Sequence, residues 1–139
     1  MFSFECTYRV RYADIDKMGF MYYGHYARLF EIARVEALRA LGVRYRDLED
    51  AGVIMPVREN KSKYLAPAKY DDLLTIKAMI KSMPGRRIVF DYEIANEEKK
   101  LIHIGETTLV FLNLSSQRVV ECPEMISEVL RPYFPAEND

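Results

Sequence analysis

The sequence predicts an α+β domain in which an antiparallel sheet of five to six strands wraps around one long central helix. Three observations lead to this prediction. A strand pattern with a period of two comes first, one long segment of helical periodicity follows, and four further strand-like segments come after it. With 139 residues, half of them apolar, the chain is long enough for one core, and we expect a single domain over residues 1–139.

The first strand is expected over residues 4–12. Apolar side chains alternate with charged or polar ones along this segment, so one face of the strand is buried and the other is wet. The residues on the apolar face are Phe4, Cys6, Tyr8, Val10 and Tyr12.

A loop from Ala13 to Gly24 leads into the long helix, which is expected to begin at His25 and to end before Gly42. Apolar residues recur along it at helical spacing, namely Tyr26, Leu29, Phe30, Ala33, Ala37 and Leu41. The apolar arc also includes Ile32, Val35 and Leu38, which predicts that the helix is enclosed on most sides.

The remainder of the chain supplies most of the sheet. A short helical turn is expected over 46–51, and the expected strands are 53–64, 73–83, 87–96 and 101–114, followed by a short strand near Val119 and a terminal helix over 123–130. Turn residues such as Pro84-Gly85 separate them. A single sheet of this kind leaves an exposed edge, so we expect a partner subunit to cover it.

Composition and charge argue against several partner classes. The 20 Lys and Arg residues offset 21 Asp and Glu residues and are interspersed with them, which does not indicate nucleic acid or an anionic membrane surface as the main partner. No apolar stretch reaches the roughly 20 residues of a membrane span, and the N-terminus lacks a secretory signal, so we expect a cytoplasmic protein. Cys6 and Cys122 are expected to be reduced, and no metal-ligand spacing occurs.

The loop before the helix carries the chemistry that the sequence offers. It brings Asp14, Asp16 and Gly19 directly in front of a helix start, where backbone N–H groups lack an intrahelical acceptor and can hold an oxyanion. A carboxylate beside them can attack a carbonyl carbon or activate water. The alternative is that both aspartates are turn and cap residues. The sequence contains no nucleophile elbow, dinucleotide fingerprint or P-loop.

Four segments together resemble the 4-hydroxybenzoyl-CoA thioesterase family and its wider acyl-CoA thioesterase relatives. They are residues 11–16 with Gly19, residues 22–26, residues 30–34, and residues 64–72 with the strand that follows. The resemblance implies the hotdog fold and a thioester hydrolase that splits a fatty or aromatic acyl-CoA into free acid and CoA. It implies no cofactor, because coenzyme A is part of the substrate, and no metal.

The resemblance also implies roles for individual residues. Asp16 takes the catalytic position, as a nucleophile or as a general base, and the backbone N–H of Tyr23 polarises the thioester carbonyl. Asp14 is expected to organise the loop. Gly24, His25 and Tyr26 are expected to contact the substrate, although a histidine at a helix start is more often a capping or packing residue.

Arg86 and Arg87 match a basic pair that binds coenzyme A phosphates in the family, a contact for which arginine is well suited. The alternative is that they blunt an exposed hairpin end. The resemblance further implies a homodimer, and a tetramer built from two dimers, with the thioester entering between subunits and its acyl end buried along the helix.

Three other functions fit parts of the pattern. An acyl-carrier-protein thioesterase would keep the chemistry and exchange the nucleotide site for a protein surface. A hotdog hydratase or dehydratase would need an Asp and His pair on a different loop-helix motif, which this sequence does not show. A non-catalytic acyl-binding module would keep the fold and make Asp16 dispensable.

Overall fold

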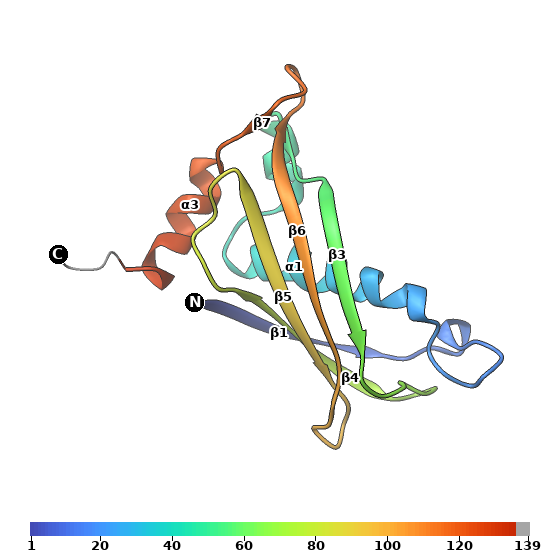
Figure 1. The fold of residues 1–139 in the computed structure, drawn as a ribbon. Helices are drawn as coiled ribbons and strands as arrows, with labels where there is room; N and C mark the ends of the chain where they lie inside the picture. The colour runs from blue at the N-terminus through green and yellow to red at the C-terminus, as the bar shows by residue number, and fades with distance from the viewer. Residues whose placement is uncertain (136–139) are drawn as a thin grey trace.

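The computed structural model describes residues 1–135, and it consists of one sheet with the long helix α1 packed across one face (Figure 1). The strands are β1 (Phe2–Arg9), β2 (Val53–Ile54), β3 (Val57–Tyr64), β4 (Leu73–Ile80), β5 (Arg87–Ala95), β6 (Leu101–Asn113) and β7 (Val119–Val120). The helices are α1 (Tyr26–Ala40), α2 (Tyr45–Asp50) and α3 (Glu124–Leu130), and 3₁₀ turns occupy Tyr12–Asp14, Tyr23–His25 and Arg131–Tyr133.

The sheet is antiparallel throughout, which confirms the predicted architecture. Its strands lie in the order β1, β4, β5 and β6, with β3 on the far side of β6, so β1 and β3 are the two edges. The short strands β2 and β7 pair with the last residues of β6. The strand predicted over 53–64 is two strands, because the chain leaves the ladder at Met55 and Pro56 and Pro56 has no N–H to donate.

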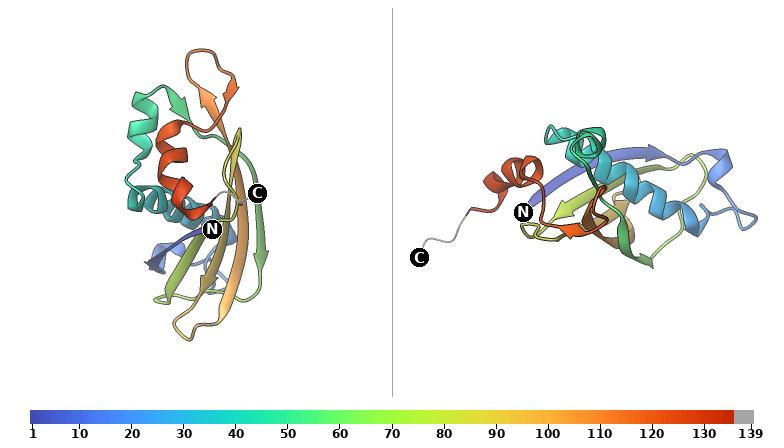
Figure 2. Two further views of the ribbon diagram at one scale, coloured as in Figure 1. Left: turned by 90° about the vertical axis from the view of Figure 1, so that its left-hand side faces the viewer. Right: turned by 90° about the horizontal axis from the view of Figure 1, so that it is seen from above.

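α1 lies against one face of the sheet (Figure 2), and the buried side chains of the core lie between them. Side chains on α1 that are spaced three or four residues apart are buried there: Tyr26, Leu29, Phe30, Ala33, Arg34, Ala37 and Leu38. Alternate residues of β4 and β5 meet them, namely Leu74, Ile76, Ala78 and Ile80, and Ile88, Phe90, Tyr92 and Ile94. These are the inward residues that the alternation predicts.

The expectation that α1 is enclosed on most sides is wrong for the single chain. Ala27, Arg28 and Glu31 are exposed, and Ile32 and Val35 are only half-buried. The sheet covers one face of the helix, and within residues 1–135 no second layer covers the other. The broad apolar arc therefore exceeds what one chain buries.

The first strand ends earlier than predicted, at Arg9. The Asp14 carboxylate accepts a hydrogen bond from the Arg11 N–H (2.9 Å), which turns the chain into the 3₁₀ turn that begins at Tyr12. Tyr12 is 82% exposed, so its expected place on the buried face is wrong.

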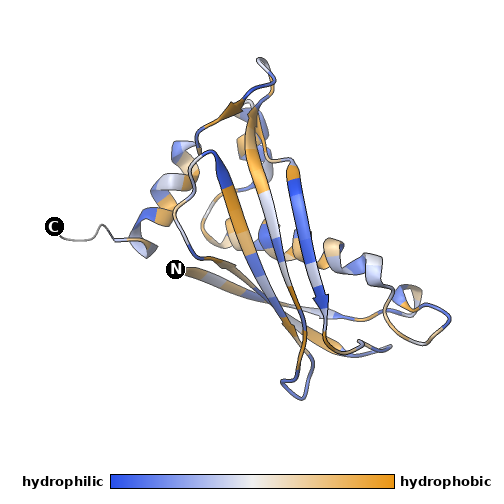
Figure 3. Ribbon diagram, in the orientation of Figure 1, coloured by the Kyte–Doolittle hydropathy of each residue, from blue (hydrophilic) through white to orange (hydrophobic). Residues whose placement is uncertain are grey.

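The edge strand β3 is hydrophilic along most of its length (Figure 3). All eight of its residues are exposed, and it pairs with β6 on one side only. Asn60, Ser62 and Tyr64 pair with residues of β6 that point toward α1, yet they remain exposed.

The thiols of Cys6 and Cys122 are free and half-buried. Within residues 1–135, no helix has both the length and the apolar character that crossing a bilayer requires.

Candidate active site

The loop between β1 and α1 is fixed at its start by the buried carboxylate of Asp14. Oδ2 accepts hydrogen bonds from Tyr8 Oη (2.6 Å) and from the Arg11 N–H (2.9 Å), and Oδ1 accepts one from Arg28 Nη2 (3.0 Å). Burial alone would raise the pKa of Asp14, but the two hydrogen bonds at Oδ2 and the Arg28 charge together hold the pKa below its usual value. Asp14 is therefore a loop-organising residue, as the sequence predicts.

Asp16 closes a tight turn at the tip of the same loop. Its Oδ1 accepts hydrogen bonds from the N–H groups of Met18 (2.9 Å) and Phe20 (3.3 Å), and Gly19 adopts φ +82°, which suits glycine. Oδ1 therefore has the turn-stabilising role that the sequence analysis gives as the alternative to catalysis. Oδ2 accepts no hydrogen bond from the residues that the structure describes, and the side chain is only half-buried.

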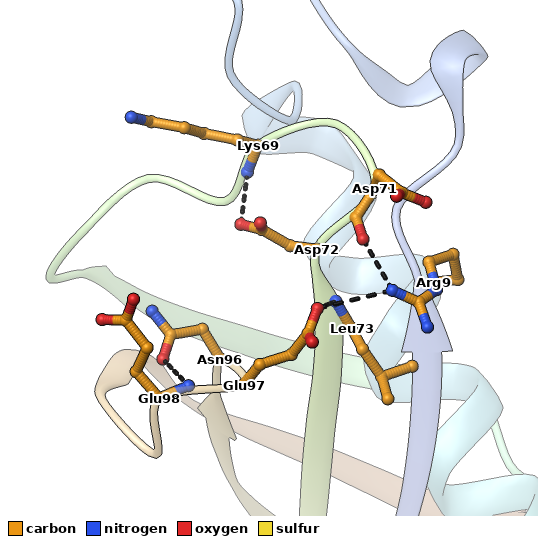
Figure 4. A network of polar contacts seen from close by, with 8 residues as sticks. All are labelled: Arg9, Lys69, Asp71, Asp72, Leu73, Asn96, Glu97 and Glu98. Atoms are coloured by element: carbon orange, nitrogen blue, oxygen red, sulfur yellow. Dashed lines mark hydrogen bonds and ion pairs between the residues drawn. The ribbon is translucent and has the colours of Figure 1, made fainter.

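The loop is held against the segment that leads into β4. The Met21 N–H donates to the Ala68 carbonyl (2.8 Å), and Phe20 forms an isolated bridge with Lys69. That segment is itself fixed by polar contacts around the end of β1 (Figure 4). Arg9 Nη1 donates to the Asp71 carbonyl (2.8 Å) and lies 3.4 Å from a carboxylate oxygen of Glu97. Asp16 therefore sits on a braced turn.

Backbone donors follow at the start of the helix. The first N–H to find an acceptor inside the 3₁₀ turn is that of His25, which donates to the Tyr22 carbonyl (3.0 Å). The N–H groups of Tyr23 and Gly24 precede it and have no acceptor within the turn. A side chain at Gly24 would place its Cβ 2.5 Å from Cε2 of the Tyr22 ring, so glycine lets that ring lie over the turn.

An apolar hollow of about 450 Å³ opens beside Asp16. Its lining comes from the loop between β1 and α1, the start of α1, the end of β3 and the segment that follows it: Asp16, Met18, Phe20, Met21, Tyr23, Tyr26, Tyr64, Leu65, Ala66 and Pro67. The structure thus brings together Asp16, Tyr23 and Tyr26, which the sequence places in the site. His25 is half-buried beside Tyr22, with ring centroids 5.6 Å apart, and does not line the hollow.

Two residues near the hollow have no role in the sequence-based prediction. Tyr64 lines it, and His103 is fully buried behind it, stacked on Tyr26 with centroids 4.0 Å apart. Burial lowers the pKa of His103 to about 4, so the ring is neutral. The signal for Tyr64 was its position in a segment that resembles the family, whereas His103 becomes visible only through its pairing with Tyr64 across β3 and β6.

Arg86 and Arg87 lie at the opposite end of the sheet from Asp16. They border a second hollow of about 420 Å³ at the β4–β5 turn. Arg86 pairs with Glu121 (Nε to Oε1, 3.3 Å), and both side chains are largely exposed. Arg87 makes no ion pair within residues 1–135. One chain therefore does not place the basic pair next to Asp16.

No cluster of three or more His, Cys, Asp or Glu side chains suited to a metal ion occurs in the described part of the chain. The chemistry available at the loop is that of the Asp16 carboxylate, which lines an apolar hollow together with Tyr23 at the start of the helix.

Comparison with known proteins places this arrangement in a family. The model of the Thioesterase-like superfamily matches residues 10–130. The acyl-CoA thioester hydrolase YbgC of Escherichia coli O6:H1 is 33% identical over 123 residues, which cover 88% of this chain and 92% of that protein. The structure of a DHNA-CoA thioesterase from Staphylococcus aureus superposes with a TM-score of 0.83 at 32% identity, covering 97% of this chain and 85% of that one.

A variant of 4-hydroxybenzoyl-CoA thioesterase bound to 4-hydroxybenzoyl-CoA shares the fold, with a TM-score of 0.83 at 21% identity over 91% of this chain and 97% of that one. These findings confirm the predicted hotdog fold and the predicted enzyme class, a thioester hydrolase. The chain therefore belongs to the Thioesterase-like superfamily.

Proposed function

We propose that the protein hydrolyses an acyl-CoA thioester in the hollow beside Asp16. One observation carries the proposal. Asp16 uses Oδ1 to hold its turn and leaves Oδ2 without a partner among residues 1–135. It lines an apolar hollow together with Tyr23, one of the residues whose backbone N–H groups open the helix. Such a carboxylate and such donors are what hydrolysis of a thioester requires.

In the proposed reaction, the backbone N–H of Tyr23, with that of Gly24 beside it, stabilises the oxyanion that forms on the carbonyl. Asp16 Oδ2 serves either route open to a carboxylate. It attacks the carbonyl carbon, the C–S bond breaks, CoA leaves as the thiolate, and water hydrolyses the resulting anhydride. Alternatively it removes a proton from the water that attacks. One oxyanion donor is worth on the order of 3 kcal/mol in other enzymes.

The test is thiol release from a panel of acyl-CoA esters by the wild type and by Asp16→Asn. Asparagine keeps the Oδ1 acceptor that holds Met18 and Phe20, so the loop should persist while the charge is lost. Asp50→Asn is the matched control, because Asp50 is exposed at the end of α2.

We expect Asp16→Asn to lose at least about a hundredfold in kcat with an unchanged unfolding temperature, a typical cost of losing a catalytic carboxylate. Full activity in Asp16→Asn would overturn the role of Asp16. If the wild type releases no thiol from any ester, the same panel on carrier-protein thioesters decides whether a carrier-protein thioesterase or a non-catalytic binding module is the better description.

We infer that the complete site spans two subunits. Within one chain, the two ends of the eight-residue strand β4 are about 25 Å apart at about 3.3 Å per residue, with the Asp16 loop near one end and Arg86 and Arg87 beyond the other. A two-fold axis perpendicular to the sheet, placed at the free edge of β3, would pair this strand with its own copy in the antiparallel direction.

That pairing reverses the direction of the partner's sheet. Tyr64 then lies toward the Val57 end of the second chain. Because Val57 pairs with Leu109 and Arg87 with the adjacent Val110, the second copy of the basic pair comes to the Asp16 end of the first chain. This supports a homodimer in which each site takes its carboxylate from one chain and its phosphate-binding arginines from the other.

Complementation tests the shared site. One chain carries Asp16→Asn and the other carries Arg86→Ala with Arg87→Ala, and the two are co-expressed with different tags and isolated as a mixed dimer. With shared sites, one of the two sites in the mixed dimer is fully wild type, so activity returns with a wild-type KM. If each chain forms its own site, the mixed dimer keeps the raised KM of the arginine variant.

A further inference from the structure

The two kinds of group that the proposed reaction uses lie on different segments of the chain. Asp16 lies on the loop between β1 and α1, whereas the backbone N–H groups of Tyr23 and Gly24 belong to the 3₁₀ turn that runs directly into α1. Both must act on one thioester carbonyl. A displacement of about 1 Å at a reacting group costs on the order of a hundredfold in rate, so the loop has to be fixed relative to the helix.

Backbone hydrogen bonds close the loop on itself. The Tyr22 N–H donates to the Asp14 carbonyl (2.9 Å), and inside that contact the Asp16 N–H donates to the Phe20 carbonyl (2.9 Å). An isolated antiparallel bridge lies between these two contacts. Residues 14–22 therefore form one braced unit, and this unit makes a side-chain contact with α1 at Asp14.

Arg28 is the residue of α1 that makes this contact. It lies in the first turn of the helix, and its Nη2 donates to Asp14 Oδ1 (3.0 Å) and to Tyr8 Oη (2.9 Å). The Tyr8 hydroxyl donates in turn to Asp14 Oδ2 (2.6 Å). Tyr8 and Asp14 are both buried, so water competes little for these contacts. The three side chains thus join α1, β1 and the loop that carries Asp16.

The shape of arginine suits this position as much as its charge does. The guanidinium is planar and holds its N–H donors in a fixed geometry, so one side chain can meet a carboxylate and a hydroxyl together. It also lies over the Tyr8 ring, with Cζ of Arg28 5.2 Å from the ring centroid. A lysine would keep the charge and lose the planar group.

We propose that Arg28 is a positioning residue for the hydrolysis. By holding Asp14 against the start of α1, it keeps the Asp16 carboxylate and the backbone donors of the helix start at a fixed relative position. The proposal rests on the proposed thioesterase function. Arg28 is absent from the lining of the hollow, so it acts through Asp14 and not on the substrate. Its contacts with Tyr8 and Asp14 lie within one chain and do not depend on which surfaces a second subunit covers.

The test measures kcat and KM for the acyl-CoA ester that the wild type hydrolyses best. Arg28→Gln keeps a long polar side chain without the guanidinium, and we expect kcat to fall about ten- to a hundredfold while KM changes by less than about threefold. Arg28→Lys keeps the charge and should recover part of the loss. Arg39→Gln is the matched control, because Arg39 lies on the same helix in an exposed ion pair with Glu36 (3.4 Å), and it should leave both constants unchanged.

A double-mutant cycle shows whether Arg28 acts through Asp14. In the Asp14→Asn background, Arg28→Gln should lower kcat at least about threefold less than it does in the wild-type background, because the charge that holds the guanidinium is already gone. An equal loss in both backgrounds overturns the route through Asp14. Circular dichroism and light scattering at the assay temperature establish that each variant is folded and keeps the wild-type mass.

Tyr8→Phe replaces Arg28→Gln if that variant does not fold. Phenylalanine keeps the buried ring and removes the hydroxyl that joins Arg28 to Asp14. We expect kcat to fall about fivefold at unchanged KM, a smaller effect because the direct contact between Arg28 and Asp14 remains. A wild-type kcat in a folded Tyr8→Phe overturns the proposal.

The outcomes separate this proposal from the proposed function. If Arg28→Gln keeps the wild-type kcat, or only raises KM, the positioning role is overturned and the thioesterase stands. If the wild type hydrolyses no ester, the function fails, and hydrogen–deuterium exchange of residues 14–25 still decides whether Arg28 fixes the loop. Faster exchange of these amides in Arg28→Gln, and not in Arg39→Gln, supports that role, whereas exchange equal to that of the wild type overturns it.

Discussion

Two carboxylates only two residues apart have opposite environments in this loop. Asp14 is 5% exposed, and both of its oxygens accept hydrogen bonds from a tyrosine, an arginine and a backbone N–H. Asp16 is half-buried and leaves one oxygen without a partner among residues 1–135. The difference assigns structure to the first carboxylate and makes the second available for chemistry.

Asp14→Asn should lower the free energy of unfolding at pH 7 by about 2 kcal/mol, because asparagine offers one acceptor oxygen in place of the two buried carboxylate oxygens that accept from Tyr8, the Arg11 N–H and Arg28. The pKa of Asp14 is lowered in the folded state, so its stabilisation is present above the unfolded pKa and is lost as pH falls through the folded pKa. Urea unfolding from pH 7 to pH 3 should show the wild-type advantage shrinking in acid. If the difference in unfolding free energy between the wild type and Asp14→Asn stays constant with pH, the ionic explanation is contradicted.

His103 should make the protein acid-sensitive. Its pKa is about 4 when folded against 6.5 in the reference state, so the unfolded chain takes up a proton that the folded chain refuses. Its contribution to stability is complete above pH 6.5 and falls by up to about 3 kcal/mol as pH drops toward 4. His103→Phe keeps a ring against Tyr26, and its unfolding free energy should decline less over this range. Parallel curves for the two proteins would exclude His103 as the cause.

At the scale of elements, one glycine sets how closely α1 approaches the sheet. A Cβ at Gly105 on β6 would lie 2.2 Å from Cζ of Phe30 and 3.0 Å from the Lys61 carbonyl oxygen. Phe30 cannot yield, because it is fully buried and stacked on Tyr92 with centroids 4.1 Å apart. The missing side chain on the strand therefore determines where the ring on the helix sits.

Gly105→Ala should destabilise the fold by about 1–3 kcal/mol, the usual cost of overpacking a core. Phe30→Leu in the same chain should restore part of that loss, since the shorter side chain vacates the space. The check is a double-mutant cycle measured by urea unfolding. If the effects of the two substitutions on the unfolding free energy are additive, the close approach of Gly105 and Phe30 is not the cause of the destabilisation.

The elements also show which features the sequence makes predictable. Strand alternation and helical spacing are local, so the inward residues of β4, β5 and α1 were predicted correctly. Asp16 could be proposed from the sequence because its loop motif is continuous in the chain. The sequence did not predict that Tyr64 lines the hollow or that His103 lies behind it, because their pairing depends on the register between β3 and β6, which joins segments about 40 residues apart. Tyr12 was misplaced because a side chain, Asp14, ends the strand.

At the scale of the whole molecule, the unpaired edge and the uncovered side of α1 indicate assembly. Every residue of β3 is exposed, and Ile32 and Val35 lie half-buried on the helix face that the sheet does not cover. An unpaired strand of this length offers a row of N–H and C=O groups to a second copy. A tetramer of two dimers stays a prediction, with the helix face as one surface for the second contact.

A pair of proline variants tests the edge. Neighbouring residues in a strand point their N–H groups in opposite directions, so of Lys61→Pro and Ser62→Pro one removes a bond to β6 and the other removes a donor on the free edge. The variant that loses only the free-edge donor should fold, lose its dimer mass by light scattering, and lose most activity. A folded proline variant of wild-type mass would place the interface elsewhere.

The order of strands in the sheet has a kinetic consequence. β4, β5 and β6 follow one another in the chain and pair as neighbours, whereas β1 joins β4 across more than sixty residues and β3 joins β6 across about forty. Closing long loops is slow, so the meander of three strands is expected to form first and the two outer strands to dock later. The loop that carries Asp16 follows β1, and Tyr64 is the last residue of β3, so both belong to the strands that are expected to dock later. The hollow beside Asp16 is thus expected to be the last part of the chain to assemble and the first to open, while the centre of the sheet stays folded.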